Sequence, residues 1–273
     1  MKKAFKDRAL ALSVWLAAGF TLSAMFFLIG HILIKGIPYL TPSLFALSYT
    51  SENVSLFPAL ITTLMTVAIS LAVAAPLGIF TAIYMVEYAS RGNRFVRLVR
   101  VTAETLSGIP SIVYGLFGML FFVTWTGWGF SLLAGGFTLA IMILPLIMRT
   151  TEESLKAVPD AYREASFGLG AGRLRTVFRI VLPAATPGIV AGMILGIGRI
   201  IGETAALIYT SGTVAKIPEN LLASGRTLAV HMYALSSEGL HTGQAYATAV
   251  ILLLVVIGVN TLSAFAAKRL AKV

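Results

Sequence analysis

The chain has 273 residues, of which 58% are hydrophobic and only 12% are charged, so it is not an ordinary soluble domain, in which about 25% of residues are charged. The formal net charge of +10 does not indicate nucleic acid binding, because the basic residues lie in the gaps between apolar runs. The sequence has no cysteine, which excludes disulfides and thiolate metal sites, and it contains no P-loop sequence for binding ATP.

Six apolar segments are each long enough to cross about 30 Å of hydrocarbon. The first follows a basic N-terminus, and its apolar core of about 25 residues exceeds the usual 7–15 of a signal peptide, so we expect a retained anchor. A short link joins the third and fourth segments, and its Trp125 and Trp128 are typical of an interfacial aromatic belt. The predicted spans are residues 9–34, 58–86, 109–125, 130–149, 187–209 and 245–267.

The Lys and Arg residues predict the orientation of these spans. Seventeen of the 21 lie in the two termini and the loops on the same side as the N-terminus, three lie in the opposite loops, and one, Arg199, lies inside a span. Because basic residues concentrate on the cytoplasmic side of a membrane, both termini are predicted to be cytoplasmic.

The inner segment between the second and third spans carries arginines three residues apart with apolar residues between them. This pattern predicts a basic amphipathic helix that lies along the membrane and ends near Gly108, before Pro110. An ordinary loop whose arginines reach the interface is the alternative. The arginines are Arg91, Arg94, Arg97 and Arg100.

The longest inner loop covers about residues 150–186 and predicts two short helices with a glycine corner between them. The first is expected over 161–168 with Asp160 as its N-cap. The second is expected over 173–181 and to be ended by Pro183 and Pro187. Such a unit offers a rigid knob to a cytoplasmic partner, unless it merely packs under the bundle.

The fifth predicted span places two charges inside the membrane, Arg199 and Glu203. Arg199 lies about 18 Å along the helix from Pro187, near mid-membrane, where an arginine costs about 2.5–3.5 kcal/mol on insertion scales. The ridge of Gly188, Gly192 and Gly196 predicts close helix packing on the same face. The charged pair is therefore expected to face a packed interior or a water-filled path.

The long inner loop resembles the EAA motif of ABC importer permeases, whose pattern is Glu-Ala-Ala, three residues, Gly, nine residues, Ile, one residue and Leu-Pro. Every spacing is kept, and the one departure is a serine, another small residue, in place of the second alanine. The resemblance implies a coupling helix that docks in a groove of a cytoplasmic ATPase. The matching residues are Glu164, Ala165, Ser166, Gly170, Ile180, Leu182 and Pro183.

Two further stretches, Ala103–Leu120 and Gly196–Thr213, are similar to phosphate permeases of the PstA type, and the resemblance covers about residues 58–262. It implies an all-α bundle of six spans in the cell inner membrane, of the MetI-like, type I ABC importer class. The expected domains are an anchor span and outer loop at 1–57, a permease domain at 58–267 and a cytoplasmic tail at 268–273.

The same resemblance implies a heteromeric complex. Its other parts are a second, PstC-like permease, a PstB-like ATPase dimer that holds ATP and Mg²⁺, and an external PstS-like phosphate-binding protein. This chain is expected to hydrolyse nothing itself, to hold no cofactor or metal and to contact membrane lipid but no nucleic acid.

Two interpretations of the buried charges remain open. Arg199 and Glu203 either neutralise each other as a structural clamp, or line the substrate pathway, where Arg199 contacts phosphate and Glu203 holds the guanidinium when no anion is bound. For the whole chain the alternatives are a permease for another oxyanion, such as sulfate or molybdate, and a membrane scaffold, which would have no need of a docking knob. A secondary transporter is disfavoured because no inverted repeat is evident.

Overall fold

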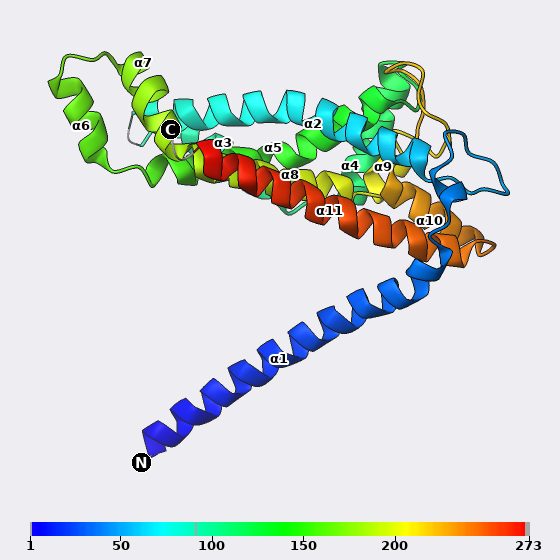
Figure 1. Ribbon diagram of the computed structural model, residues 1–273. Coiled ribbons are helices and arrows are strands. Elements are labelled where there is room, and N and C mark those ends of the chain that lie inside the picture. Colours follow the sequence, from blue (N-terminus) through cyan, green and yellow to red (C-terminus); the bar gives the residue numbers. More distant parts are fainter. Residues whose placement is uncertain (1, 91, 271–273) are drawn as a thin grey trace.

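The computed structural model describes residues 2–90 and 92–270, and all of the regular elements among them are helices (Figure 1). The expected all-α fold is therefore confirmed. Arg91 and the last three residues of the expected tail lie outside the described residues. The α-helices are α1 (Lys2–Gly36), α2 (Phe57–Ile83), α3 (Arg94–Ser107), α4 (Ser111–Gly118), α5 (Leu132–Lys156), α6 (Asp160–Gly168), α7 (Arg173–Thr176), α8 (Leu182–Ile201), α9 (Ala205–Ile208), α10 (Leu228–Glu238) and α11 (Thr242–Leu270).

Shorter helical segments complete the chain. The 3₁₀ segments η1 (Ile37–Tyr39) and η2 (Pro42–Phe45) follow α1. The segments η3 (Tyr84–Tyr88) and η4 (Met119–Trp125) are π-helical and continue α2 and α4, and the π-helical η5 (Val177–Val181) precedes α8. Because π-helical turns are rare and often lie at functional sites, these three span ends are candidates for functional positions.

Five helical runs are long and apolar enough to cross a membrane: Leu10–Tyr39, Phe57–Tyr88, Leu132–Lys156, Arg173–Gly202 and Thr242–Phe265. A sixth candidate is the pair formed by α3 and the run Ser111–Trp125, which is bent by 103°. The predicted third span corresponds to that run, and α3 lies across the end at which it begins. The amphipathic helix expected before Pro110 is thereby confirmed, with Asn93 as its N-cap and Gly108 as its C-cap.

The core of the bundle is built by α2, α5 and α8. Helix α5 packs on both of the others, and its Leu139, Ile143 and Ile147 are fully buried. A Cβ at Gly192 of α8 would collide with Thr150 of α5, so the predicted glycine ridge does bring these two helices into close contact.

Helix α1 is peripheral. Figure 1 shows it running away from the bundle and meeting α11 only near its C-terminal end. There Gly36 lies directly against the Tyr246 backbone, where a Cβ would not fit. Most of the apolar side chains of α1 are exposed, Phe20 and Trp15 most of all, which suits a helix that contacts lipid or another subunit.

The predicted boundary between the inner loop and the fifth span is wrong. Instead of ending at the prolines, α7, η5 and α8 form one helical run from Arg173 to Gly202. Pro183 lies in the first turn of α8, where the missing N–H is tolerated, and Pro187 lies inside the helix. Prolines are tolerated within spans because local π or 3₁₀ adjustments re-satisfy the backbone, and η5 directly precedes Pro183.

Candidate functional site

The predicted fifth span is interrupted at the end of the helical run Arg173–Gly202, contrary to the continuous helix expected over 187–209. Helix α8 ends at Ile201, residues 202–204 are not helical, and the short α9 follows. Glycine at position 202 weakens a helix, and the Glu203 carboxylate accepts a hydrogen bond from the Ala206 N–H at 3.2 Å, which satisfies a donor in the first turn of α9. Within the hydrocarbon region, irregular backbone is tolerated only where it is covered by protein or lines a water-filled cavity.

The expected contact between Arg199 and Glu203 does not form. Both residues are described, yet no salt bridge joins them, because the break at Gly202 removes Glu203 from the helical face that carries Arg199. Arg199 is exposed on the surface of this single chain, whereas Gly196 and Ile200 beside it are buried. The guanidinium therefore faces a surface that a partner or water must cover within the membrane, rather than a packed interior of this chain.

The structure brings together the two stretches that carry the sequence resemblance. Gly115 of α4 lies against the backbone of Ala206 in α9, so closely that a Cβ would not fit. The neighbouring Tyr114 is buried, donates a hydrogen bond from its hydroxyl to the Leu106 carbonyl at 2.8 Å, and lies within electrostatic range of Arg199. Tyr114 is thus a residue of this site that the sequence alone did not single out.

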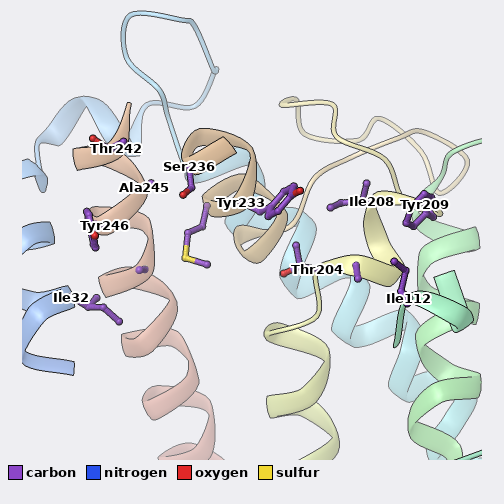
Figure 2. A pocket seen from close by; sticks show the side chains of 13 residues that line it. Ile32, Ile112, Thr204, Ile208, Tyr209, Tyr233, Ser236, Thr242, Ala245 and Tyr246 are labelled. Atoms are coloured by element: carbon purple, nitrogen blue, oxygen red, sulfur yellow. The ribbon is translucent and has the colours of Figure 1, made fainter. Parts of the chain in front are cut away.

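A cavity of about 690 Å³ lies next to the break in the fifth span (Figure 2). Thr204, Ile208 and Tyr209 line it on one side, and Tyr233 and Tyr246 approach from α10 and α11. None of its lining residues is charged, and Arg199 is not among them. Without a cation this cavity has little to stabilise a bound oxyanion.

The inner knob consists of α6, the turn 169–172 and α7. Gly170 in this turn has φ +81°, a left-handed conformation that glycine adopts without strain, so the predicted glycine corner is confirmed. The buried Ser166 hydroxyl lies 2.8 Å from that of Thr176 and closes the corner from inside. The expected cap is wrong in register: Pro159 is the N-cap, and Asp160 is the first residue of α6.

The surface of the knob is open and carries both charged and apolar side chains. Glu164 and Ala165 are exposed, as are Tyr162, Phe167 and Leu174, and Leu169 at the tip is 90% exposed. Ile180 and Leu182 are partly buried and Pro183 is exposed, at the base of the knob where η5 runs into α8. Exposed apolar side chains gathered on a rigid loop are typical of a protein docking surface.

One arginine, not identified from the sequence, fastens the knob to the bundle. Arg163 of α6 donates to Glu87 in η3 from Nε and Nη2, the latter at 2.7 Å, and to the carbonyls of Val158 and Leu155 at 2.8 and 2.9 Å. Its hydrogen bonds to Glu87 raise the pKa of Arg163 above its ordinary value, and the nearby Asp160 acts in the same direction. The knob is therefore held to both α2 and α5.

The segment between α9 and α10 and the start of α10 bury one charged and one titratable side chain, Arg226 and His231. Arg226 is buried with its guanidinium over the ring of Tyr49 at 4.6 Å, and His231 of α10 meets the edge of the same ring. Burial, helped by the charge of Arg226, lowers the pKa of His231 to about 3. Both side chains thus pack the loop around Tyr49 against α10, and neither points into solvent.

We expect His231 to make the protein acid-sensitive. The unfolded chain takes up a proton on this histidine below its ordinary pKa of 6.5, whereas the folded chain does not until about pH 3. Stability is therefore unaffected above pH 6.5 and falls by about 1.4 kcal/mol per pH unit below it. Thermal unfolding of the His231→Phe variant, which keeps a ring, should lose this dependence between about pH 7 and 5, and His241→Gln should keep it. An unchanged slope in His231→Phe contradicts the assignment.

Comparison with known proteins places the chain in one family. Residues 74–272 match the family described as binding-protein-dependent transport system inner membrane component. A probable ABC transporter permease protein, YqgI of Bacillus subtilis, is 37% identical over 185 residues, and the match spans 63% of each of the two chains. The phosphate transport system permease protein PstA of Mycobacterium leprae is 35% identical over 76% of this chain and 69% of its own length. The PstA of Pasteurella multocida is 34% identical, with 76% and 74% covered.

Solved structures show the same fold at low identity. A chain of a bacterial alginate ABC transporter, in complex with an alginate-bound periplasmic protein, matches with a TM-score of 0.68 at 16% identity, over 94% of this chain and 96% of the other. A chain of the MetNI methionine ABC transporter matches with a TM-score of 0.62 at 19% identity, over 79% and 94%. The likeness confirms the predicted fold of an ABC importer permease.

Proposed function

This chain belongs to the binding-protein-dependent transport system inner membrane components, and we propose that it is the transmembrane permease subunit of an ATP-driven importer of inorganic phosphate. The observation that carries the proposal is the kept spacing of the EAA loop, folded as an exposed knob at one end of the bundle, in a chain of the PstA type. A membrane scaffold has no need of such a knob.

Coupling to the ATPase is assigned to the knob. Glu164 and Ala165 lie on its exposed face, Gly170 forms its corner, and Ser166 holds the corner closed. Ile180, Leu182 and Pro183 join it to α8, the helix that carries Arg199. A movement of the knob imposed by ATP binding in a docked ATPase would therefore reach Arg199 through one continuous helical run.

Phosphate is the proposed substrate because the PstA relatives are named for phosphate transport and because Arg199 suits it chemically. A guanidinium presents several N–H donors in a planar fork that matches phosphate oxygens. Sulfate and molybdate are the alternatives, since both are oxyanions of similar shape. Glu203 accepts a hydrogen bond from the first turn of α9 at the same break, and its negative charge close to Arg199 in sequence would weaken anion binding enough for release.

The exposure of Arg199 supports a second permease subunit. A charge at this depth in contact with lipid is strongly disfavoured, so the surface around Arg199 is better explained as half of a path that a PstC-like chain completes. We further propose a PstB-like ATPase dimer, which binds ATP and Mg²⁺ and carries out all hydrolysis, and a PstS-like external binding protein. The solved alginate transporter is described in complex with a periplasmic protein.

Isolation of the complex tests this proposal. We expect the chain to co-purify from its native membrane with a second permease and an ATPase. Reconstituted with the external binding protein, the complex should take up phosphate when ATP is supplied, and the same assay with sulfate and molybdate should give no more than background uptake. Preferred uptake of either of those anions contradicts the substrate, and purification without an ATPase contradicts the class.

The orientation gives a separate prediction. If both termini and the knob are cytoplasmic, cysteines introduced as Ser51→Cys and Ser237→Cys react with a membrane-impermeant thiol reagent on intact cells, whereas Ala4→Cys and Ala171→Cys react only after lysis. Because the natural chain has no cysteine, each variant reports a single site. Labelling of Ala171→Cys on intact cells contradicts both the orientation and the coupling role of the knob.

The corner at Gly170 gives another prediction. A Cβ at Gly168 or at Gly170 has free space around it, but only Gly170 has positive φ. The Gly170→Ala variant therefore strains the corner by about 1–2 kcal/mol, and we expect it to lower the ATP hydrolysis that loaded binding protein stimulates by about tenfold. Gly168→Ala, the matched control, should stay within about twofold of the natural chain. Equal activities of the two variants contradict a role for the corner geometry.

A further inference from the structure

A groove of about 730 Å³ lies at the inner end of the bundle, apart from both Arg199 and the docking face of the knob. Helix α3 forms one wall, η3 together with Ala89, Ser90 and Gly92 forms another, and Lys156 at the end of α5 closes it. Its polar lining includes Asn93, Arg97, Arg100 and Glu104. None of these side chains takes part in the coupling or the anion pathway proposed above.

The groove carries an excess of positive charge. Arg100 and Lys156 both contact one carboxylate, that of Glu152, at 2.6 Å. Arg97 lies one turn before Arg100, is exposed, and forms no salt bridge with any residue of the described ranges. The groove lining holds three cations and one carboxylate, Glu104, and the carboxylate of Glu152 lies behind Arg100 and Lys156, which leaves one positive charge in excess. A singly charged phosphodiester would balance the groove.

Helix α3 also exposes an apolar stripe next to these arginines. Val96 and Val99 pack against the bundle, whereas Phe95, Leu98 and Val101 are exposed, and Val101 borders the groove. Because α3 is bent by 103° from the span that follows it, it lies across the end of the bundle and not along the spans. An amphipathic helix in this position, with arginines beside an apolar stripe, is typical of one that lies in the membrane interface.

We infer that this groove binds the phosphate headgroup of an anionic membrane phospholipid, with Arg97 as the principal contact and the acyl chains lying along Phe95 and Leu98. A phosphoryl group could also come from free phosphate, but free phosphate has no apolar part that could pack on the exposed apolar stripe. The inference does not depend on which anion the transporter moves. A bound lipid would also contact the segment that holds the knob. Segment η3 borders the groove and carries Glu87, the partner of Arg163.

The test measures bound lipid on the purified whole complex by native mass spectrometry, after exchange into detergent with phosphatidylglycerol or phosphatidylcholine. We expect the natural complex to retain phosphatidylglycerol preferentially. One arginine near an anionic lipid contributes about fivefold in affinity, so Arg97→Gln should lower this retention about fivefold, and Arg94→Gln combined with it should lower it further. Lys216→Gln, which removes one charge from the outer loop, is the matched control and should change nothing.

Three results would overturn the lipid site. Equal retention of phosphatidylglycerol by Arg97→Gln and the natural complex removes the basis for it. Displacement of the lipid by millimolar inorganic phosphate assigns the groove to the free anion instead. Loss of the ATPase or the second permease from Arg97→Gln, with lipid retention unchanged, shows that the face is a contact between subunits.

Discussion

Replacing Arg163 with alanine is expected to abolish coupled transport, although Arg163 lies outside the EAA pattern. Its side chain is 14% exposed and that of Glu87 is 8% exposed, so the change leaves a buried carboxylate without its cation. Breaking a buried ion pair in this way costs about 3–5 kcal/mol. The carbonyls of Val158 and Leu155 lose their donor as well. The knob should then detach from α2 and α5 while the spans still insert, since Arg163 lies outside every candidate span.

A lysine at the same position separates charge from geometry. Arg163→Lys keeps the positive charge but cannot reach Glu87 and the two carbonyls at once, so we expect most of the coupling to be lost. Arg149→Ala is the matched control, because its ion pair with Glu153 joins side chains that are 68% and 64% exposed. An exposed pair contributes about 0–1 kcal/mol, and this variant should transport normally.

The measurement is ATP hydrolysis stimulated by loaded binding protein, together with the amount of ATPase that co-purifies. Loss of both in Arg163→Ala, with normal values in Arg149→Ala, fits the proposed role. If Arg163→Ala hydrolyses ATP at the natural rate in response to the binding protein, the contact with Glu87 is structural and has no part in coupling.

The knob shows what local sequence can predict. The start of α6 after Pro159 and the corner at Gly170 follow from short-range spacing, because turns and helix ends are determined by a few neighbouring residues. The contact between Arg163 and Glu87 could not be predicted in this way. The two residues are 76 positions apart, and no pattern in either segment points to the other.

The break in the fifth span escapes prediction for a different reason. Residues 187–209 are almost uniformly apolar, and an apolar run long enough to cross the membrane predicts a continuous helix. The local cues are Gly202 and the polar Glu203 and Thr204, which weaken a helix or cap the next one. Long-range packing then favours the break, because the missing side chain of Gly115 lets the backbone of α9 pack closely against α4.

The break changes what is expected of Arg199. If the arginine and Glu203 were a clamp within one helix, Arg199→Ala would leave a carboxylate unpaired in the membrane and the complex would fail to assemble. In the structure Glu203 instead accepts a hydrogen bond from the Ala206 N–H and forms no salt bridge with Arg199. We therefore expect Arg199→Ala to assemble with its partners and to retain ATP hydrolysis.

Transport by the Arg199 variants should nevertheless collapse. Each hydrogen bond from a guanidinium to an anion contributes about 1.5–3 kcal/mol, so losing a bidentate contact should lower ATP-driven phosphate uptake at least 100-fold in Arg199→Ala. Arg199→Lys keeps the charge but not the fork and should lose at least tenfold. Glu203→Gln retains an oxygen that accepts from the Ala206 N–H, so it should assemble normally, and because it loses the charge proposed to aid release, it should slow uptake less than Arg199→Ala does.

The double variant, Arg199→Ala with Glu203→Ala, distinguishes the two interpretations. A structural clamp predicts that removing both charges restores assembly and uptake together. A pathway arginine predicts that the double variant hydrolyses ATP in response to the binding protein but moves no more phosphate than Arg199→Ala alone. Reconstituted complexes, assayed for uptake and hydrolysis in the same vesicles, measure both quantities. Normal uptake by the double variant would remove Arg199 from the phosphate path, whereas hydrolysis without uptake places the guanidinium where the anion must pass.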